Sequence, residues 1–252
     1  MARREETIKN ALSRDLIDRG TTDLAEGVSQ ADVVVMATPV RAIMQQLEQI
    51  GPLLSKGCLV LDLGSTKAQI VAKMEQLPDH VQPLGAHPMC GKEFSGIAEA
   101  DPALYQDCTF ILTPLPRTSE EALALGHELA GAAGAHPLVL SPERQDFLVA
   151  TLSHLPYLLA CALVRTADAT TSADPAAWEI VAGGFRDTSR VASSDVTMMI
   201  DILMTNRDEV LKAANVFQAQ LGNLARLIET GEEEGLREAL LGIREERMRM
   251  FP

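Results

Sequence analysis

Short apolar runs alternate with amphipathic segments through the first 141 residues of the chain. The runs have the length and continuity of strands, the first two of strands buried on both faces, and they lie at 32–37, 58–63, 81–86, 108–112 and 135–140. The segments between and before them predict helices at 2–19, 23–30, 40–54, 68–77 and 119–134. This alternation predicts a doubly wound, Rossmann-like sheet with parallel strands and right-handed crossovers. His87-Pro88 should end the third strand, because proline has no N–H for a strand ladder.

The pattern changes after Ser141, and no further strand is evident. Helices are predicted at 142–169, 174–182, 194–230 and 232–250, with a break at Gly183-Gly184. We therefore expect two domains, an α/β domain over residues 1–141 and an all-helical domain over residues 142–252. The apolar stretch 147–164 contains His154 and Pro156, which favours a buried helix of a soluble protein over a membrane span. A stretch this apolar should not face water in a monomer, so we expect a homodimer built through the helical half.

Composition narrows the class of protein. The 252 residues carry a net charge of −13, which argues against a nucleic-acid surface because such a surface needs a basic stripe. Hydrophobic residues make up 46% of the chain, enough for a sizeable core. The four cysteines lack paired spacing, which argues against a zinc site and a disulfide framework, and free thiols suit a cytoplasmic protein. The charged N-terminus has no apolar segment of the kind found in signal peptides.

Several predicted strands end in residues that can take part in chemistry, namely Thr38, Gly64-Ser65 and His87. The carboxyl ends of parallel strands meet at one edge of a sheet, where ligands bind, so we expect these residues around one crevice. His87 precedes a glycine-bounded loop, 91–96, that carries Lys92 and Glu93. An imidazole titrates near neutrality and can accept or donate a proton there. From this stretch alone, a histidine that merely caps a turn explains the pattern as well.

Four motifs follow one another along the chain: 62–67 (DLGSTK), His87-Pro88-Met89 with Gly91 and Glu93, 153–156 (SHLP), and 184–190 (GFRDTSR) followed by Ser194-Asp195. Their order and spacing resemble those of the prephenate/arogenate dehydrogenase family of tyrosine biosynthesis, over essentially the whole chain. Each motif alone is weak, but four in order are specific. The resemblance implies oxidation of prephenate to 4-hydroxyphenylpyruvate, or of arogenate to tyrosine, with loss of carbon dioxide and hydride transfer to NAD or NADP. The residues decide neither between the two substrates nor between the two cofactors.

The resemblance also implies roles for single residues. His87 would hold the ring hydroxyl and take its proton as the hydride leaves, with Ser65 beside that hydroxyl. Arg190 would grip a substrate carboxylate with its planar guanidinium. Arg186 is a second candidate, although a surface ion pair with Asp187 explains it equally well. Cofactor contact falls to the strand ends, at Thr38, Pro39, Gly64, Ser65 and Thr66.

The third motif departs from the family pattern. His154 matches the first histidine of a Ser-His-Leu-Pro-His motif and is a candidate for substrate binding, but a histidine on an apolar helix could equally be a core residue. Tyr157 replaces the second histidine of that motif. A phenol can donate a hydrogen bond to a carboxylate but cannot carry positive charge. We therefore place Tyr157 in the substrate site and leave the choice of substrate open.

A second departure lies at the N-terminus. The family opens with a strand, a Gly-x-Gly-x-x-Gly turn, a helix and a second strand that together bind the cofactor pyrophosphate. These 252 residues contain no such glycine motif, so we expect an N-terminally incomplete nucleotide-binding domain that binds nicotinamide cofactor poorly as written. One hypothesis is the enzyme with a start recorded too late or a truncation. The alternative is a non-catalytic remnant that serves as a dimeric binding or interaction protein. A β-hydroxyacid dehydrogenase ranks last, because 142–169 lacks the lysine expected there.

Overall fold

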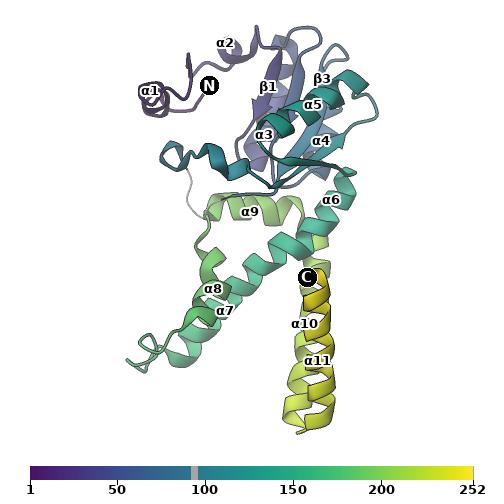
Figure 1. Cartoon of the computed structure of the whole chain (residues 1–252). Helices are drawn as coiled ribbons and strands as arrows, with labels where there is room; N and C mark the ends of the chain where they lie inside the picture. Colours follow the sequence, from purple (N-terminus) through teal and green to yellow (C-terminus); the bar gives the residue numbers. More distant parts are fainter. Residues whose placement is uncertain (92–95, 252) are drawn as a thin grey trace. The chain divides into compact units, whose positions relative to one another are not determined.

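The computed structural model describes residues 1–91 and 96–251, in two compact units that span 1–207 and 208–252. Residues 92–95 and Pro252 lie outside the described residues, and with them the predicted loop residues Lys92 and Glu93. Among the residues described, five strands form one sheet (Figure 1): β1 (Val33–Met36), β2 (Leu59–Asp62), β3 (Gln82–Pro88), β4 (Thr109–Pro114) and β5 (His136–Val139). A Rossmann-like α/β half followed by a helical half is confirmed.

The strands pair in parallel except at one position. The order is β1-β2-β3-β4-β5, and the pairs β1–β2, β2–β3 and β4–β5 are parallel as expected. β3 and β4 instead run antiparallel. In its described part, the connection between them contains only the 3₁₀ turns Ile97–Glu99 and Pro102–Tyr105. A parallel return usually passes through an α-helix that crosses a face of the sheet, and the described part of this connection contains none. The prediction of parallel pairing throughout is wrong at this step.

Helices cover both faces of the sheet (Figure 1). α3 (Val40–Ile50) and α4 (Ala68–Met74) form one core with the sheet, and α5 (Glu120–Ala132) forms the second core on the other face. Buried side chains of α3 recur at three- and four-residue intervals, as an amphipathic helix requires. Two shorter helices, α1 (Glu5–Ser13) and α2 (Leu24–Val28), precede the sheet. The predicted helix 2–19 is therefore real but shorter than its pattern.

The first strand is less buried than its sequence predicts. All four residues of β2 are buried, but Val35 in β1 is 49% exposed. α5, which covers one face of the sheet, contacts β3, β4 and β5. β1 is an edge strand in the described sheet, out of reach of that cover. The prediction of burial on both faces is confirmed for β2 and wrong for β1.

β3 continues through Pro88, where the sequence predicts its end. Pro88 lies opposite Phe110 of β4, whereas pairing with β2 stops at Leu84. The N–H of Met89 donates to the carbonyl oxygen of Thr109 at 2.8 Å. Because backbone N–H groups alternate sides along a strand, the nitrogen of Pro88 points to the other edge, where the ladder with β2 has already ended. The missing N–H therefore costs this strand no hydrogen bond.

The helical half of the first unit follows β5. It contains α6 (Pro142–Val149), a π-helical turn (Ala150–His154), α7 (Leu155–Thr171), α8 (Gly183–Ser189), a 3₁₀ turn (Arg190–Ser193) and α9 (Val196–Thr205). The helix predicted at 174–182 is wrong, because these residues form turns. The Asp174 carboxylate accepts the N–H of Ala176 at 2.9 Å, a local bond that competes with helix formation. Gly183-Gly184 begins α8 instead of breaking a helix.

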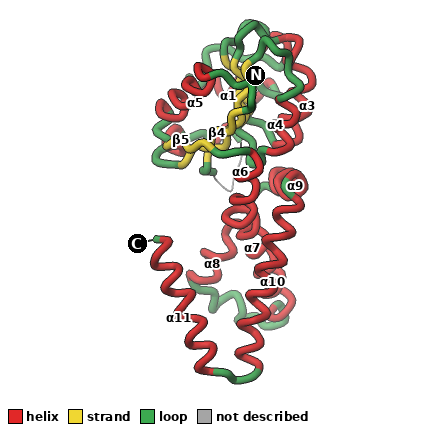
Figure 2. The backbone as a smooth tube through the Cα atoms, turned by 90° about the vertical axis from the view of Figure 1, so that its right-hand side faces the viewer, coloured by secondary structure: helices red, strands yellow, loops and turns green. Residues whose placement is uncertain are grey.

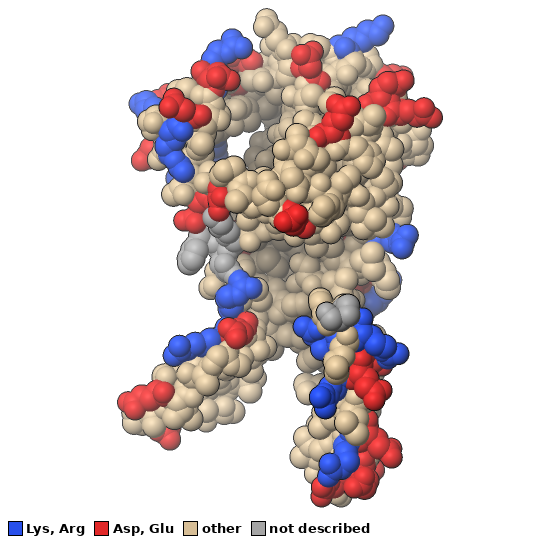
Figure 3. Space-filling model, viewed as in Figure 1, with Lys and Arg blue, Asp and Glu red and all other residues tan. Residues whose placement is uncertain are grey.

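α7 is poorly covered within a single chain. Only Leu155 and Ala160 of its residues are buried, and Leu152 in the preceding turn is 72% exposed. The segment Pro142–Thr171 is also long and apolar enough to cross a membrane by length and composition. α7 and α8 form the extension at the lower left of Figure 1, and the surface of this extension along α7 carries few charged side chains (Figure 3). The prediction of a buried helix is therefore wrong for the isolated chain.

The second unit consists of two helices joined by a tight turn. Nearly all of α10 (Arg207–Glu229) belongs to this unit, and after the turn α11 (Glu233–Met250) runs back in the opposite direction (Figure 2). Gly231 has a φ of 67°, a left-handed conformation that glycine adopts without strain. Arg226 donates to Glu232 across the turn at 3.0 Å. Both helices leave large apolar side chains exposed, among them Val216, Leu221, Ile228, Leu240 and Ile243.

Candidate active site

A cavity of about 430 Å³ opens where β2 and β3 end. Five of the residues predicted from the sequence line it together: Ser65, His87, His154, Tyr157 and Arg190. Apolar side chains of α9, including Met198 and Ile202, form part of the remaining wall. An apolar wall with a few convergent polar groups is typical of small-molecule sites. The cavity is therefore the strongest candidate for an active site among the described residues.

A buried ion pair lies behind the cavity. Asp62, at the end of β2, and Lys67 are both 0% exposed, and the Lys67 ammonium donates to the Asp62 carboxylate. The same carboxylate accepts the N–H of Gly64 at 2.8 Å and that of Ala86 at 3.3 Å. Burial raises the pKa of Asp62 and lowers the pKa of Lys67, and the attraction between the two charges opposes both shifts. The pair ties the end of β2 to β3, directly before His87.

His87 reaches the cavity from β3 as a neutral imidazole. Burial, then the positive charge of Lys67 and the proximity of His154, lower the pKa of His87 to about 3. The Gln145 amide opposes this shift. At neutral pH one ring nitrogen of His87 therefore carries a lone pair and can accept a proton.

Gln145 and Asp146, in α6, organise the strand ends. Asp146 caps α4, because its two carboxylate oxygens accept the N–H groups of Lys67 at 2.7 Å and Ala68 at 2.9 Å. The Gln145 amide donates to the Ser65 carbonyl at 3.3 Å and to Asp146 at 3.0 Å. With its donors committed, the orientation of the amide is fixed. Its Oε1 atom and Nδ1 of His87 are both buried and lack a hydrogen-bond partner among the described residues.

His154 lies in the π-helical turn and is 1% exposed. Asn206 donates from Nδ2 to the Asp146 carbonyl at 2.7 Å and lies 3.3 Å from Nδ1 of His154. The amide N–H makes Nδ1 the acceptor, so the network assigns the proton of the neutral ring to Nε2. Burial lowers the pKa of His154 to about 4, which keeps the ring neutral at pH 7. His154 is thus both a core residue and a wall of the cavity, so the two sequence interpretations are compatible.

Most of the strand-end residues predicted to contact cofactor lie outside the cavity lining. The Thr38 hydroxyl donates to Gln46 at 3.0 Å, and Pro39 precedes the first turn of α3. Thr66 is fully buried, with its hydroxyl 2.8 Å from that of Thr205 in α9. A Cβ atom on Gly64 would lie 2.5 Å from a methyl of Ile70, so a larger residue there would displace the Ile70 side chain. Ser65 alone of this predicted set lines the cavity.

Carboxylates of the helical half occupy the starts of two sheet-covering helices. Asp146 caps α4, as described above, and Asp201 of α9 accepts the N–H of Arg41 in the first turn of α3 at 3.1 Å. The Arg41 side chain also pairs with Asp201 at 3.5 Å. Helix N-termini at this edge of a sheet commonly bind phosphate groups. Here the N–H groups of Lys67, Ala68 and Arg41 bind carboxylates of the chain itself. These bonds dock α6 and α9 on the sheet half.

The remaining predicted residues differ in their placement. Arg190 begins the 3₁₀ turn after α8 and lines the cavity, whereas Arg186 is exposed on α8 outside the lining. Tyr157 is half-buried on α7. Burial and the Cys161 thiol, one helical turn further on, raise the pKa of Tyr157, so its phenol keeps its proton. Glu93, quoted with the second motif, lies outside the described residues.

Four polar residues that organise the site escape sequence reasoning as functional residues: Lys67, Gln145, Asp146 and Asn206. One signal was available in the sequence. Gln145-Asp146 is a polar pair at the start of the long apolar segment. Polar side chains that are buried in such a segment nearly always form hydrogen bonds. The contacts themselves join residues far apart in the chain, which local patterns do not reveal.

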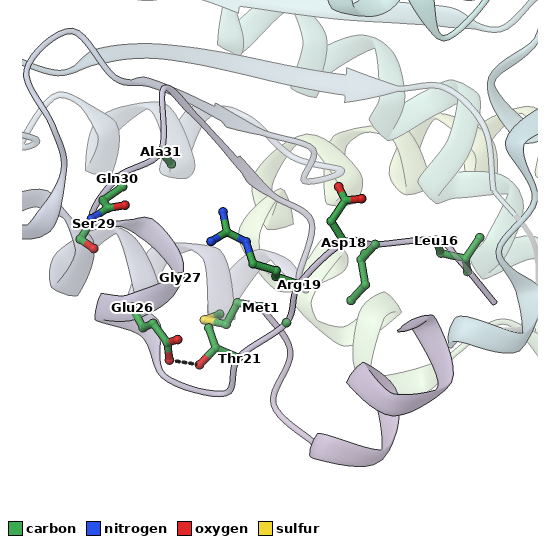
Figure 4. Close-up of a pocket in the computed structure, with 12 residues that line it drawn as sticks. Met1, Leu16, Asp18, Arg19, Thr21, Glu26, Gly27, Ser29, Gln30 and Ala31 are labelled. Carbon is green, nitrogen blue, oxygen red and sulfur yellow. Dashed lines mark hydrogen bonds between the residues drawn. The ribbon is translucent and has the colours of Figure 1, made fainter. Parts of the chain in front are cut away.

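A larger cavity, of about 750 Å³, is lined by Met1, by the segment 16–21 after α1 and by residues of the segment 26–31 in and after α2 (Figure 4). Its lining includes Asp18 and Arg19, and Thr21 donates to Glu26 at 2.6 Å along its rim. None of its lining residues is a histidine or a cysteine. The convergent polar groups that chemistry requires are found in the smaller cavity.

Comparison with known proteins assigns family models to both halves. The model described as "Prephenate dehydrogenase, nucleotide-binding domain" matches residues 1–139. The model described as "Prephenate dehydrogenase, dimerization domain" matches residues 141–241. The predicted boundary at residue 141 stays a prediction.

Similar proteins include a prephenate dehydrogenase of Bacillus subtilis, 33% identical over 90% of this chain and 62% of the relative. A cyclohexadienyl dehydrogenase of Zymomonas mobilis is 31% identical over 90% of this chain and 78% of the relative. The solved prephenate dehydrogenase of Aquifex aeolicus, in complex with hydroxyphenyl propionate and NAD+, superposes with a TM-score of 0.91. It is 32% identical and covers 99% of this chain and 87% of its own. The chain spans less than two thirds of the length of the first curated relatives, 62% and 64%.

Proposed function

Because the chain belongs to the prephenate dehydrogenase family, we propose that it catalyses the oxidative decarboxylation of prephenate, or of arogenate, with a nicotinamide cofactor in tyrosine biosynthesis. In this reaction the ring carbon that bears the hydroxyl loses a hydride, the ring carboxylate leaves as carbon dioxide, and the ring becomes aromatic. The observation that carries the proposal is a neutral, buried His87 in one cavity with Ser65 and Arg190. A cytoplasmic location is part of the same proposal.

His87 acts as the proton acceptor for the ring hydroxyl. Removing that proton builds carbonyl character on the ring carbon and drives the hydride out. The depressed pKa of His87 keeps the imidazole unprotonated, so the acceptor is available throughout the neutral range. Gln145 positions this ring, because its fixed Oε1 is the buried acceptor available to Nδ1–H. A hydrogen bond from Nδ1–H to this oxygen would leave the lone pair on Nε2 for the substrate.

Arg190 holds a carboxylate of the substrate. A guanidinium matches a carboxylate with two parallel donors, and Arg190 lines the cavity where Arg186 does not. Nε2–H of His154 and the protonated phenol of Tyr157 add neutral donors to the same wall. Among the described lining residues, the site therefore offers the guanidinium of Arg190 and several neutral donors to an anionic ring substrate. The set supports a dicarboxylate or carboxylate-bearing cyclohexadienol and leaves prephenate and arogenate as alternatives.

NAD or NADP supplies the hydride acceptor when bound. Ser65 is half-buried in the cavity wall at the end of β2, and Thr38 lies at the end of the neighbouring β1. Both stand at the carboxyl edge where open α/β sheets bind nucleotides. Ser65, Thr38, Pro39 and Gly64 would flank the nicotinamide end on that edge. Thr66 is committed to Thr205 and serves docking of α9 instead.

We also propose that the protein is a homodimer formed through its helical half. α7 is long and apolar and is mostly uncovered in one chain, and Leu152 beside it is exposed. Monomeric proteins rarely expose apolar patches of this extent. The family model that matches residues 141–241 is described as a dimerization domain. Light scattering at micromolar concentration should give twice the chain mass of 27.2 kDa, and a monomer would contradict the proposal.

The proposed reaction is tested by its stoichiometry. The purified protein is supplied with prephenate or arogenate and with NAD or NADP at concentrations high enough to offset the weak cofactor binding expected of these residues, and the reduced nicotinamide and the released carbon dioxide are both measured. Equal amounts of the two are expected from one of the four combinations. A calorimetric titration with 3-(4-hydroxyphenyl)propanoate checks the cavity independently of the cofactor. Binding of this ligand without turnover would favour the alternative, a non-catalytic binding protein, and absence of both would contradict the proposed function.

A further inference from the structure

Cys90 and Cys108 flank the one antiparallel step of the sheet. Registered pairs run from Leu84 opposite Pro114 to Pro88 opposite Phe110. The hydrogen bond from Met89 to Thr109, at 2.8 Å, extends the same register by one residue beyond the last registered pair. The next residues in each direction are Cys90 and Cys108. The two cysteines therefore stand directly opposite each other at the end of the β3–β4 ladder.

The hydrogen-bond pattern makes this a close pair. Hydrogen-bonded and non-hydrogen-bonded pairs alternate along an antiparallel ladder, and Met89–Thr109 is hydrogen-bonded, so Cys90–Cys108 is of the non-hydrogen-bonded kind. The Cys108 carbonyl is turned the other way, where it accepts the N–H of His136 at 2.8 Å. Cα atoms of such pairs lie about 4.5 Å apart, which is inside the range of about 4.4–6.8 Å that disulfides span.

The two side chains are close enough to affect each other's ionisation. The pKa of Cys90 is raised to about 12, first by burial, then by the charge of Cys108 and by a hydrogen bond with Cys108. Both cysteines also lie near Tyr105, because burial and then the charges of Cys90 and Cys108 raise the pKa of its phenol. Neither cysteine is fully buried, so a small reagent can reach them. The other two thiols lie elsewhere, Cys58 in the core under α3 and Cys161 beside Tyr157.

We propose that Cys90 and Cys108 form an oxidation site, which a low-molecular-weight disulfide converts into an intramolecular cross-link on the wall of the candidate active site. Cys90 lines that cavity three residues after His87, so the modification lies within the site. Sequence spacing does not reveal the pair, because cross-strand partners need no short Cys-x-x-Cys pattern. The inference needs only the β3–β4 register and is independent of the proposed catalytic activity.

The exchange proceeds in two balanced steps. The Cys108 sulfur loses its proton and attacks the reagent's disulfide, which forms a mixed disulfide and expels one thiolate. Cys90, the thiol that keeps its proton in the resting pair, then loses it and attacks the Cys108 sulfur, which expels the second thiolate. The protein loses two electrons and two protons in total, and the reagent is reduced to two thiols. Excess reduced thiol reverses both steps.

The test incubates the native protein with increasing ratios of oxidised to reduced glutathione, followed by alkylation and tryptic digestion. Cleavage after Lys92 and Arg117 separates the two cysteines, so a cross-link appears as two joined peptides. Joined Cys90 and Cys108 peptides are expected, with Cys58 and Cys161 alkylated. Cys161→Ser, the matched control, should retain the cross-link, whereas Cys108→Ser should lose it. Alkylation of both residues at every ratio, only mixed disulfides with glutathione, or a link to another cysteine would each overturn the proposal.

A second measurement asks whether the native register already suits the bond. A cross-link that forms without strain restricts the unfolded chain and should raise the midpoint of thermal unfolding by several degrees. The comparison is between oxidised and reduced wild-type protein, with Cys108→Ser under the same two conditions as the control. An unchanged or lower midpoint in the cross-linked protein would contradict the assignment of Cys90 and Cys108 as opposed partners.

Discussion

Acidification from pH 7 to pH 4.5 should destabilise the protein through His87 in a way that can be isolated. The pKa of His87 is about 3 in the folded chain and 6.5 without its environment. Between these values the unfolded chain binds a proton that the folded chain excludes, so the free energy of unfolding falls as the pH falls. Above about pH 6.5 this loss is absent. At about 1.36 kcal/mol per pH unit, His87 should account for about 2–3 kcal/mol at pH 4.5.

The assay is denaturant unfolding of wild-type protein and His87→Asn at both pH values. Asparagine cannot take the proton, so the loss of stability on acidification should be smaller in the variant by about 2–3 kcal/mol. Other groups, including His154 with its pKa lowered to about 4, titrate in both proteins and cancel in the difference. His136→Asn, which replaces an exposed imidazole, is the matched control and should follow the wild type. Equal pH dependence of His87→Asn and wild type would refute a buried, neutral His87.

Three further predictions concern neighbouring parts of the site. Lys67→Met leaves the buried Asp62 charge without its partner and should lower the free energy of unfolding, measured with denaturant, by about 3–5 kcal/mol. Adding Asp62→Asn should recover part of this loss, and a double variant as unstable as the single one would contradict the pairing. Arg190→Ala should raise KM tens-fold with little change in kcat, because Arg190 is proposed to hold a carboxylate in ground and transition states alike. Arg186→Ala should change neither KM nor kcat, and equal effects of the two variants would contradict the assignment of Arg190. Gln145→Leu should lower kcat about 10- to 100-fold. Gln145→Glu places a carboxylate beside His87 and should move the acid limb of the pH profile of kcat/KM to higher pH. An unchanged acid limb would show that Gln145 does not face His87.

The architecture was largely predictable because it rests on local patterns. The continuous apolar run of β2 and the three- and four-residue spacing in α3 reflect burial, which periodicity reports directly. The reversal at β4 was not predictable in this way. An apolar run such as 108–112 looks the same whichever way its neighbour runs, and direction depends on the length and path of the preceding connection. Likewise, periodicity at 174–182 could not reveal that Asp174 would bond its own backbone.

The candidate site was predictable only where residues stand at strand ends. Ser65 follows β2, and His87 lies near the end of the adjacent parallel strand β3, so topology alone brings them together. Thr66 shows the limit of that rule, because its hydroxyl contacts that of Thr205 in α9 and the residue does not line the cavity. The contacts of Asn206 with Asp146 and His154 depend on how α9 docks, and docking is decided by tertiary packing.

The central claim, that His87 takes the hydroxyl proton as the hydride leaves, is tested most directly by steady-state kinetics of His87→Asn with prephenate and with arogenate. The charge on the hydroxyl oxygen changes most in the transition state, so loss of the proton acceptor acts on the chemical step. The account predicts a kcat about 10²- to 10⁴-fold below that of wild type, with KM little changed. A kcat within a few-fold of wild type on both substrates would contradict it and leave His87 as a structural residue of the β3 end.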